Sequence, residues 1–415
     1  MSTVIPKAIP ITLIKEMTEI NRVLCGERVY RKPIKYSNDF TTEATLLKKP
    51  FYFNSIGSGC YTCKSNTMTL TLLIDQLLPP PPQGEALWQS VKAPALKTIL
   101  AHARPVHCLP GVANDRESWL GQALGLKRQE DWPWASLMAH EESLSDAAKG
   151  YWLFASPVYL DTQRQGLILN EPTKISPLEY QALSTTLCEH FNEAHIDCHP
   201  TSQFGQGWLL RIPQPQQVHH FNVSQVVGNN IRHFLPKGPH SAYWHRLLTE
   251  TQMILHDHTI NLIREKDGHP PINSVWFWGG GTRPTPEQSP FKTVHSVDPM
   301  IKAIARFQSS LTPLMKHSYE DTPLNEGSHL LIFDHLSKHW RQHNLNAWIA
   351  DLENWDRQWM RPVLNDLKNR RIHELHLIST DVRGIQQWSI KPRDFLKFWR
   401  TSVSLSSLFD AHKSP

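Results

Sequence analysis

The chain has 415 residues, 40% of them hydrophobic, with 15 tryptophans and 31 prolines, which is typical of a packed, loop-rich globular protein and excludes a disordered one. No run of about 18 apolar residues occurs, so we expect no transmembrane helix. The formal charge of +5 lies in residues 1–67, which hold ten Lys and Arg against five Asp and Glu. The remaining chain has 33 basic and 33 acidic residues, so it lacks the overall positive charge that is typical of nucleic-acid-binding proteins.

Residues 1–67 lack sustained hydrophobic periodicity. We expect them to form a basic, poorly ordered extension, which is either the artefact of an upstream start codon or a genuine basic arm. Met68 then opens an apolar run that predicts a buried strand ending at Asp75. The proline-rich stretch 76–82 predicts a stiff surface connector.

The hydrophobic pattern predicts the remaining elements. Helices are expected at 86–103, 119–126 and 135–140. Residues 150–221 are expected to form an α+β unit. It contains strands at 152–160, 167–169 and 207–212 and a helix from Ser176 to about 192. After residue 222, helices at 241–256, 297–310 and 344–369 alternate with strands at 272–278, 329–333 and 374–379. This alternation predicts an α/β fold with a mostly parallel sheet flanked by helices, formed by 68–149 and 222–415, with 150–221 inserted.

The six cysteines show no disulfide framework. Cys60 and Cys63 have the spacing of a zinc or redox half-site, but no second pair lies near them in the sequence. The spacing of Cys188 and Cys198 among His190, His195 and His199 fits no zinc motif and predicts a solvated, His-rich loop. Scattered thiols of this kind predict a cytoplasmic location.

The segment from His258 to Gly281 is the most informative part of the chain. A polar helix ends at Gly268, a β-branched and aromatic strand follows, and the strand stops at the three glycines Gly279, Gly280 and Gly281. Ligands gather at the carboxyl ends of strands in open α/β sheets, so these glycines are candidate binding residues. The alternative is a tight strand-to-loop turn beside two core tryptophans.

Polar residues cluster near these glycines. Asn261 and Arg264 lie three residues apart, on one face of a helix. Together with His258 and Asn273 they could bind a phosphate or carboxylate group. Alternatively, Arg264 pairs with a neighbouring acid or caps the helix end.

The same segment resembles archaeal-type cofactor-independent phosphoglycerate mutases of the alkaline phosphatase superfamily. It resembles more closely a group of bacterial phosphoglycerate-mutase-like proteins, also described as Rpf-type regulatory proteins. Further blocks similar to that group are 131–134, 151–160, 250–256 and 395–400. The resemblance implies an alkaline-phosphatase-like core, a lid at 150–221, two divalent metal ions such as Mn or Zn, and a Ser or Thr nucleophile.

The resemblance also implies candidate site residues. They are the metal ligands Asp75, Asp334, His335 and Asp381, each close to the end of a predicted strand, and the nucleophile Ser136 near a helix start. The glycines expected after Asp75, the polar context of the nucleophile and the histidine expected after Asp381 are missing. Four such ligands are too few to coordinate two metal ions, although they could coordinate one.

These observations predict a phosphoglycerate-mutase-like protein with a degenerate metal site that acts by binding or regulation. Its expected ligand is a small phosphorylated or carboxylate molecule, and neither nucleic acid nor membrane is an expected partner. Two alternatives remain open. One is an active metal-dependent mutase or phosphatase, and the other is a protein-interaction scaffold that uses the tryptophan-rich surface and the proline stretch.

Overall fold

The computed structural model describes residues 67–79, 84–106, 115–144, 146–164, 166–171, 175–201, 206–214, 216–341, 344–381, 384–397, 399–400 and 404–410. All described residues belong to one unit, Asn66–Pro415. The predictions for the basic extension and for the Cys60 and Cys63 pair therefore lie outside the described residues.

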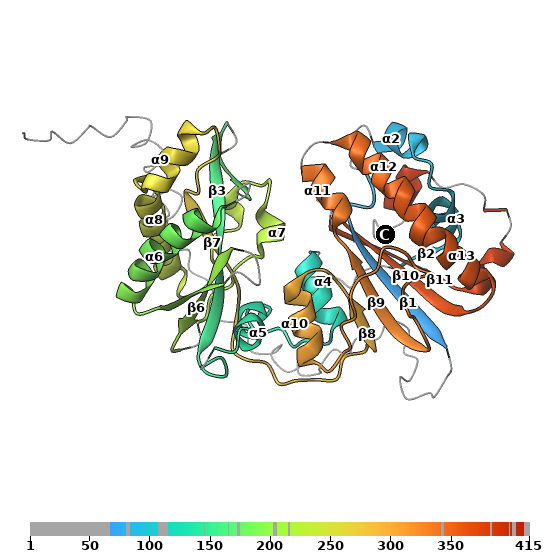
Figure 1. Cartoon of the computed structure of the whole chain (residues 1–415), viewed down its shortest axis with the longest axis horizontal. Helices are drawn as coiled ribbons and strands as arrows, with labels where there is room; N and C mark the ends of the chain where they lie inside the picture. Colours follow the sequence, from blue (N-terminus) through green and yellow to red (C-terminus); the bar gives the residue numbers. More distant parts are fainter. Residues whose placement is uncertain are drawn as a thin grey trace, which may run out of the picture. The chain divides into compact units, whose positions relative to one another are not determined.

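The first sheet has six strands in the order β2-β11-β10-β1-β9-β8 (Figure 1). Their bounds are Arg104–Val106 for β2, Gly384–Ile390 for β11, Ile372–Asp381 for β10, Met68–Asp75 for β1, Gly327–Phe333 for β9 and Thr293–His295 for β8. The strand β1 is parallel to β10 and β9, and β8 is parallel to β9, whereas β11 is antiparallel to β10. Almost all of β1 is buried, as expected for a central parallel strand covered on both faces. The predicted α/β fold with a mostly parallel sheet is confirmed.

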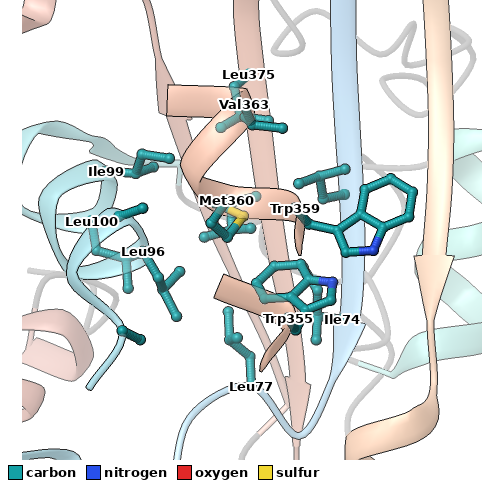
Figure 2. Packing of buried hydrophobic residues seen from close by; sticks show 14 of the residues in the cluster. Ile74, Leu77, Leu96, Ile99, Leu100, Trp355, Trp359, Met360, Val363 and Leu375 are labelled. Atoms are coloured by element: carbon teal, nitrogen blue, oxygen red, sulfur yellow. The ribbon is translucent and has the colours of Figure 1, made fainter. Parts of the chain in front are cut away.

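Four helices and a large hydrophobic core cover one face of this sheet. The helices are α2 (Gly84–Ser90), α3 (Pro94–His102), α12 (Leu345–Trp355) and α13 (Arg361–Lys368). Figure 2 shows side chains of α3 and of the 355–363 stretch packing together with Ile74 of β1 and Leu375 of β10. Instead of the single helix predicted at 344–369, a π-helical turn, Asp356–Met360, joins α12 to α13. The buried Asp356 carboxylate accepts hydrogen bonds from Leu96 N at 2.7 Å and Ala95 N at 3.3 Å, so this turn satisfies the free N–H groups of α3.

The second sheet has five strands, all antiparallel to their neighbours. The path is β4-β3-β6-β5, and β7 pairs with β3. The bounds are Gly166–Asn170 for β4, Tyr151–Gln163 for β3, Gly207–Ile212 for β6, Asp197–Thr201 for β5 and Ser274–Gly281 for β7. The helices α6 (Pro177–Glu193), α8 (Ser241–His256) and α9 (Thr259–Lys266) lie together on one side of these strands (Figure 1). The predicted start of α6 is confirmed, because Ser176 and Glu179 form a capping box.

The position of β7 corrects the sequence analysis. Its strand was expected in the parallel core sheet, but it pairs antiparallel with β3, with Trp278 opposite Phe154 and Trp276 opposite Ser156. All eight residues of β7 are buried. An apolar run of this kind suits any strand covered on both faces, so the pattern could not tell one sheet from the other. The predicted boundary of the insert at residue 221 stays a prediction.

Several shorter helices complete the described part of the chain, and two of them, α4 and α5, lie between β2 of the first sheet and β3 of the second. They are α4 (Arg116–Ala123), α5 (Trp134–Glu141), α7 (Val223–Val226), α10 (Pro299–Phe307), α11 (His335–Arg341), α14 (Leu405–Asp410) and the 3-10 turns Ile231–His233 and Pro392–Leu396. Among the described helices, none has both the length and the apolar composition needed to cross a membrane.

A disulfide bond joins Cys188 of α6 to Cys198 of β5. The chain reverses after α6 through His195, which has a left-handed φ of 60°, and Ile196 N donates to Phe191 O at 2.9 Å. This reversal brings the start of β5 back beside the last turns of α6. The expectation that these two thiols are free in a solvated loop is wrong, because sequence spacing does not reveal such a reversal.

Candidate functional site

The carboxyl ends of the parallel strands carry a partly buried arginine, Arg116, among acidic side chains. Asp75, the last residue of β1, has its Oδ2 atom 3.0 Å from Nε of Arg116. Its Oδ1 atom accepts a hydrogen bond of 2.5 Å from Oγ1 of Thr380, the residue opposite Asp75 on β10. The end of the central strand therefore faces a cationic side chain.

Arg116 is the first residue of α4, whose N-cap Asp115 accepts a hydrogen bond from Ser118 N. Besides Asp75, its guanidinium lies 3.7 Å from Asp298 Oδ2 and 3.7 Å from Glu117 Oε1. Burial alone would lower the pKa of Arg116, but the attraction of the carboxylates of Asp75, Glu117, Asp298 and Asp334 raises it instead. Arg116 is therefore a permanent positive charge at this edge.

Two acids of this group belong to helix starts. Asp298 is the N-cap of α10 and accepts a hydrogen bond of 2.9 Å from Met300 N, which explains the Asp298-Pro299 sequence. Glu117 follows Arg116 on α4 and accepts a hydrogen bond from Ser224 Oγ. Burial raises the pKa of Glu117 to about 7, although Arg116 acts in the opposite direction.

The structure brings two of the four predicted metal ligands, Asp75 and Asp334, into the electrostatic neighbourhood of Arg116. His335 follows Asp334, and its ring packs edge-on against Phe333 at 6.0 Å. Burial lowers the pKa of His335, and this is only partly offset by Asp351 and Asp334. Asp381 comes one residue after Thr380, so strand alternation directs it to the opposite face of the sheet.

The donor set does not fit a two-metal centre. Within the part of the chain that the structure describes, no three His, Cys, Asp or Glu side chains are arranged to hold a metal ion. The oxygen of Asp75 that a cation would need is paired with the Arg116 guanidinium. Arg116 and Asp298 are not among the residues predicted from the sequence, and the signals that point to them are the helix starts at Asp115 and Asp298.

Ser136, the predicted nucleophile, lies on α5 and is fully buried. Its hydroxyl is 2.9 Å from Pro133 O and 3.3 Å from Thr282 O, and both acceptors are main-chain carbonyls. The helix α5 packs on β3 and β7 of the second sheet. A catalytic role for Ser136 stays a prediction.

The two predicted asparagines hold the turn that leads into β7. Asn261 accepts from Ile272 N at 2.7 Å and donates to Leu255 O and Ile272 O at 2.6 and 2.9 Å. Asn273 accepts from Leu160 N at 2.8 Å and donates to Leu160 O at 2.9 Å, which extends the pairing of β7 with β3. Both side chains complete the main-chain hydrogen bonding of this corner.

Arg264 and His258 are also held by internal contacts. Arg264 is 1% exposed, and it donates from Nε to Pro270 O at 2.8 Å and from Nη1 to Glu179 Oε1 at 2.9 Å. His258 is the N-cap of α9 and accepts from Ile260 N, while its Nε2 atom lies 3.1 Å from Thr186 Oγ1. Arg264 thus forms an ion pair, as one alternative anticipated, but with Glu179 rather than with a sequence neighbour.

The three glycines allow the backbone to approach other parts of the chain. A Cβ atom on Gly280 would lie 2.1 Å from the Tyr151 hydroxyl, and one on Gly281 would lie 2.6 Å from Cβ of Pro133. Gly279 has a φ of 72°, which few other residues adopt. Their role in packing against α5 and β3 matches the alternative of a tight strand end.

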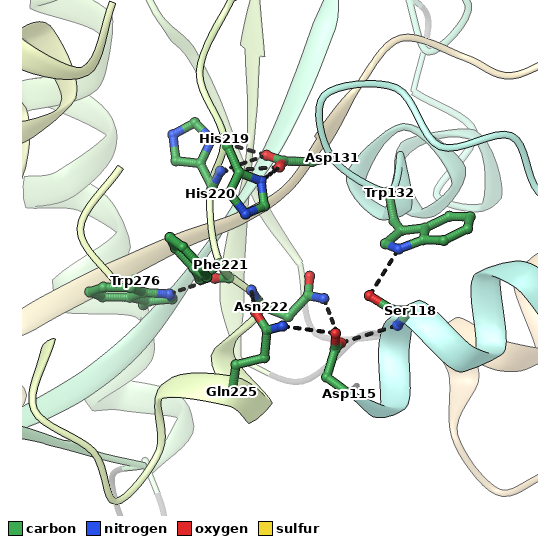
Figure 3. Close-up of polar contacts among 10 residues, drawn as sticks. All are labelled: Asp115, Ser118, Asp131, Trp132, His219, His220, Phe221, Asn222, Gln225 and Trp276. Atoms are coloured by element: carbon green, nitrogen blue, oxygen red, sulfur yellow. Dashed lines mark hydrogen bonds and ion pairs between the residues drawn. The ribbon is translucent and has the colours of Figure 1, made fainter. Parts of the chain in front are cut away.

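A second polar cluster joins residues 115–132 to residues 219–225 (Figure 3). Asp131 accepts hydrogen bonds from His220 N at 2.9 Å and from the Nδ1 atoms of His219 and His220 at 2.5 and 3.2 Å. Burial would raise the pKa of Asp131, but these histidine contacts lower it. Asp115 accepts from Asn222 Nδ2 at 2.9 Å and Gln225 Nε2 at 2.8 Å.

Comparisons with known proteins connect the chain to one group of enzymes. No protein-family model matches the chain. A stretch of 70 residues is 31% identical to the 2,3-bisphosphoglycerate-independent phosphoglycerate mutase of Methanosarcina barkeri and covers 17% of each chain. A stretch of 85 residues is 34% identical to the corresponding mutase 2 of Methanothermobacter thermautotrophicus and covers 20% of this chain and 19% of that one. The matches therefore span less than a fifth of these curated relatives.

Solved structures resemble the chain over a greater length. The cofactor-independent phosphoglycerate mutase of Thermoplasma acidophilum superimposes on 78% of this chain and 89% of its own, with a TM-score of 0.38 and 14% identity. The PH0037 protein of Pyrococcus horikoshii superimposes on 83% of this chain and 92% of its own, with a TM-score of 0.43 and 12% identity. In one segment, the chain is thus similar in sequence to phosphoglycerate mutases that do not depend on 2,3-bisphosphoglycerate.

Proposed function

We propose that this chain is a phosphoglycerate-mutase-like protein of the alkaline phosphatase superfamily in which Arg116 stands in the place of the metal ions. It acts by binding, in a regulatory role in the cytoplasm, rather than by phosphoryl transfer. The observation that supports this proposal is the Arg116 guanidinium, 3.0 Å from Asp75 and 3.7 Å from Asp298 at the carboxyl edge of the parallel sheet.

Electrostatics explains why such an arginine opposes metal binding. Two unit charges of the same sign about 4 Å apart repel each other by about 4 kcal/mol at the effective dielectric constant of a protein surface, and a divalent ion feels about twice as much. A metal ion at Asp75 would therefore have to displace the guanidinium. The nearby acids hold that guanidinium in place and raise its pKa.

The proposed ligand is a small phosphorylated or carboxylate molecule, but Arg264 is not its anchor. The Arg264 side chain is buried and already bonded to Glu179 and to Pro270 O. Arg116 is also a poor anchor for an anion, because it is surrounded by Asp75, Asp298 and Asp334. The ligand is therefore expected to use other side chains.

Metal titration tests the proposal. Calorimetry with Mn²⁺ or Zn²⁺ is expected to show no tight binding of two ions per chain, and the purified protein with Mn²⁺ is expected not to interconvert 3- and 2-phosphoglycerate. Arg116→Ala is expected to gain one weak divalent-ion site, because the acids lose their counter-ion. Arg371→Ala is the control, since Arg371 is 74% exposed and its nearest acid, Asp366, is not part of the Arg116 group.

Two tightly bound metal ions together with mutase turnover in the wild-type protein would overturn the proposal. That result would favour the active enzyme, the alternative to which the sequence similarity with the archaeal mutases points.

A further inference from the structure

A surface pocket of about 410 Å³ lies beside the second sheet, apart from the Arg116 group. Its walls come from three parts of the chain: the reversal 194–196 after α6, the end of β6 with Gln216, and residues 239–243 at the start of α8. The volume falls in the range of small-molecule sites in proteins.

The pocket combines an apolar floor with the polar side chains of His195, Gln216 and His240. Ile196 and Ile212 are buried beneath it, and none of the described residues that line it is Asp, Glu, Lys or Arg. His240 Nδ1 accepts a hydrogen bond from Gln217 N at 3.3 Å, so the neutral imidazole carries its proton on Nε2 and can donate it. His195 and Gln216 also line the pocket. These groups suit a small, mainly apolar molecule with one hydrogen-bond-accepting end.

One wall of the pocket lies inside the loop that the disulfide closes. Ala194, His195 and Ile196 lie between Cys188 and Cys198, which are ten positions apart. The hydroxyl of Tyr243 on α8 donates a hydrogen bond of 3.5 Å to Ala194 O, so two of the lining residues contact each other. Both cysteines are only partly buried. Cleavage of the disulfide would remove one of the links that hold this wall, beside the hydrogen bond from Ile196 N to Phe191 O.

We propose that this pocket binds a small apolar molecule with one acceptor group, and that the Cys188–Cys198 disulfide controls its affinity. A reduced dithiol opens the bond: one thiolate attacks a cysteine sulfur and forms a mixed disulfide, and the other cysteine leaves as a thiolate. The second thiol of the dithiol then releases the first cysteine. The dithiol becomes a disulfide, and the two cysteines gain two electrons and two protons.

The first test measures the disulfide itself. Intact protein prepared without reductant is alkylated, digested and examined by mass spectrometry. Cys188 and Cys198 are expected in one disulfide-linked peptide, which dithiothreitol converts to two alkylated thiols. Two free thiols before dithiothreitol is added would overturn the redox control.

The second test measures binding with three probes: phenylacetate, phenyl phosphate and phenylacetamide. Titration followed by NMR is expected to show millimolar binding of at least one of them to the oxidised protein, and the preferred probe identifies the acceptor group. Ala242→Trp fills the pocket and is expected to abolish binding. Met253→Trp, an exposed site on the same helix outside the pocket, is the control and is expected to keep it.

The third test links the two observations. Dithiothreitol is expected to weaken probe binding roughly tenfold, because the loosened wall must be ordered again on binding. The double substitution Cys188→Ser and Cys198→Ser is expected to bind as weakly as the reduced protein and not to respond to dithiothreitol. Absence of binding by all three probes, or binding that Ala242→Trp leaves unchanged, would overturn the proposed site.

Discussion

Single residues in this chain show how a polar side chain that suggests a ligand site can instead hold the fold together. His258, Asn261, Arg264 and Asn273 were grouped by sequence because Arg, Asn and His side chains recognise anions. In the structure each of them is bonded to main chain or side chains nearby. Sequence supplies the residue types and their spacing, but it does not show which buried groups of the same corner need those donors and acceptors.

Arg264→Ala separates the two roles of this arginine. The substitution leaves Pro270 O and the Glu179 carboxylate without their partner, so we expect the free energy of unfolding to fall by about 2 to 3 kcal/mol. Urea denaturation measures this change. Arg246→Ala is the matched control, because Arg246 is 67% exposed and pairs with Glu250 one helical turn away, and it is expected to cost less than about 0.5 kcal/mol. Unchanged stability of Arg264→Ala would point back to a binding role.

Glu117 predicts a pH dependence of stability. Its pKa is raised by burial from 4.5 to about 7 in the folded protein, so the folded state binds more protons than the unfolded state between these values. The free energy of unfolding therefore falls as the pH rises through this window, by about 3 kcal/mol from this residue. Glu117→Gln is expected to be more stable than the wild type above pH 7, with little difference near pH 4.5.

Chemical denaturation at a series of pH values measures this difference directly. The wild-type curve contains other titrating groups, so the prediction concerns the difference between Glu117→Gln and the wild type. Glu250→Gln, at a partly exposed position of α8, is the control and is expected to follow the wild type. A difference that does not change with pH would contradict the raised pKa.

At the level of elements, the sequence predicted long elements better than short ones. The strand β1 and the helices α6 and α8 were predicted close to their observed bounds, because each has a clear apolar period or a capping signal. β8 has three residues and β11 is rich in glutamine, and neither was predicted. The strand β7 was predicted as a strand but assigned to the wrong sheet, since pairing depends on contacts between residues more than 100 positions apart.

The glycines at the end of β7 give a test at this scale. Gly280→Ala places a methyl group on the Tyr151 hydroxyl, and we expect a loss of about 1 to 3 kcal/mol in the free energy of unfolding. The buried Tyr151 hydroxyl has no hydrogen-bond partner among the described residues, so Tyr151→Phe alone is expected to be nearly neutral. Combined with Gly280→Ala, it is expected to restore part of the lost stability.

A double-mutant cycle measured by urea denaturation tests this coupling. Additive effects of Gly280→Ala and Tyr151→Phe would mean that the glycine is needed for a reason other than the close contact with Tyr151. A ligand-binding role would then regain support.

At the level of the whole molecule, acids at strand ends were predictable, but the cation among them was not. Asp75 ends β1 and Asp334 follows β9, and these two strands are parallel neighbours, so the proximity of the two acids follows from the predicted sheet. Arg116 is the first residue of α4, and only the fold brings it to Asp75. The chemistry of this edge thus depends on a long-range contact that apolar periodicity does not encode.

Asp131 provides a test of how distant segments are held together. Its carboxylate, 3% exposed, accepts hydrogen bonds from His219 and His220, which are 88 and 89 positions away. In Asp131→Asn, an amide NH₂ group replaces one carboxylate oxygen and faces the N–H donors of the histidines. We therefore expect the free energy of unfolding to fall by about 3 kcal/mol near neutral pH. Because the histidines lower the pKa of Asp131, its contribution is present above the ordinary aspartate value of 3.8 and is lost as the pH falls below it. Thermal unfolding at neutral pH and at pH 3 tests this prediction. The difference in stability between Asp131→Asn and the wild type should be smaller at pH 3. A difference that is the same at both pH values would mean that the carboxylate charge does not join the two segments.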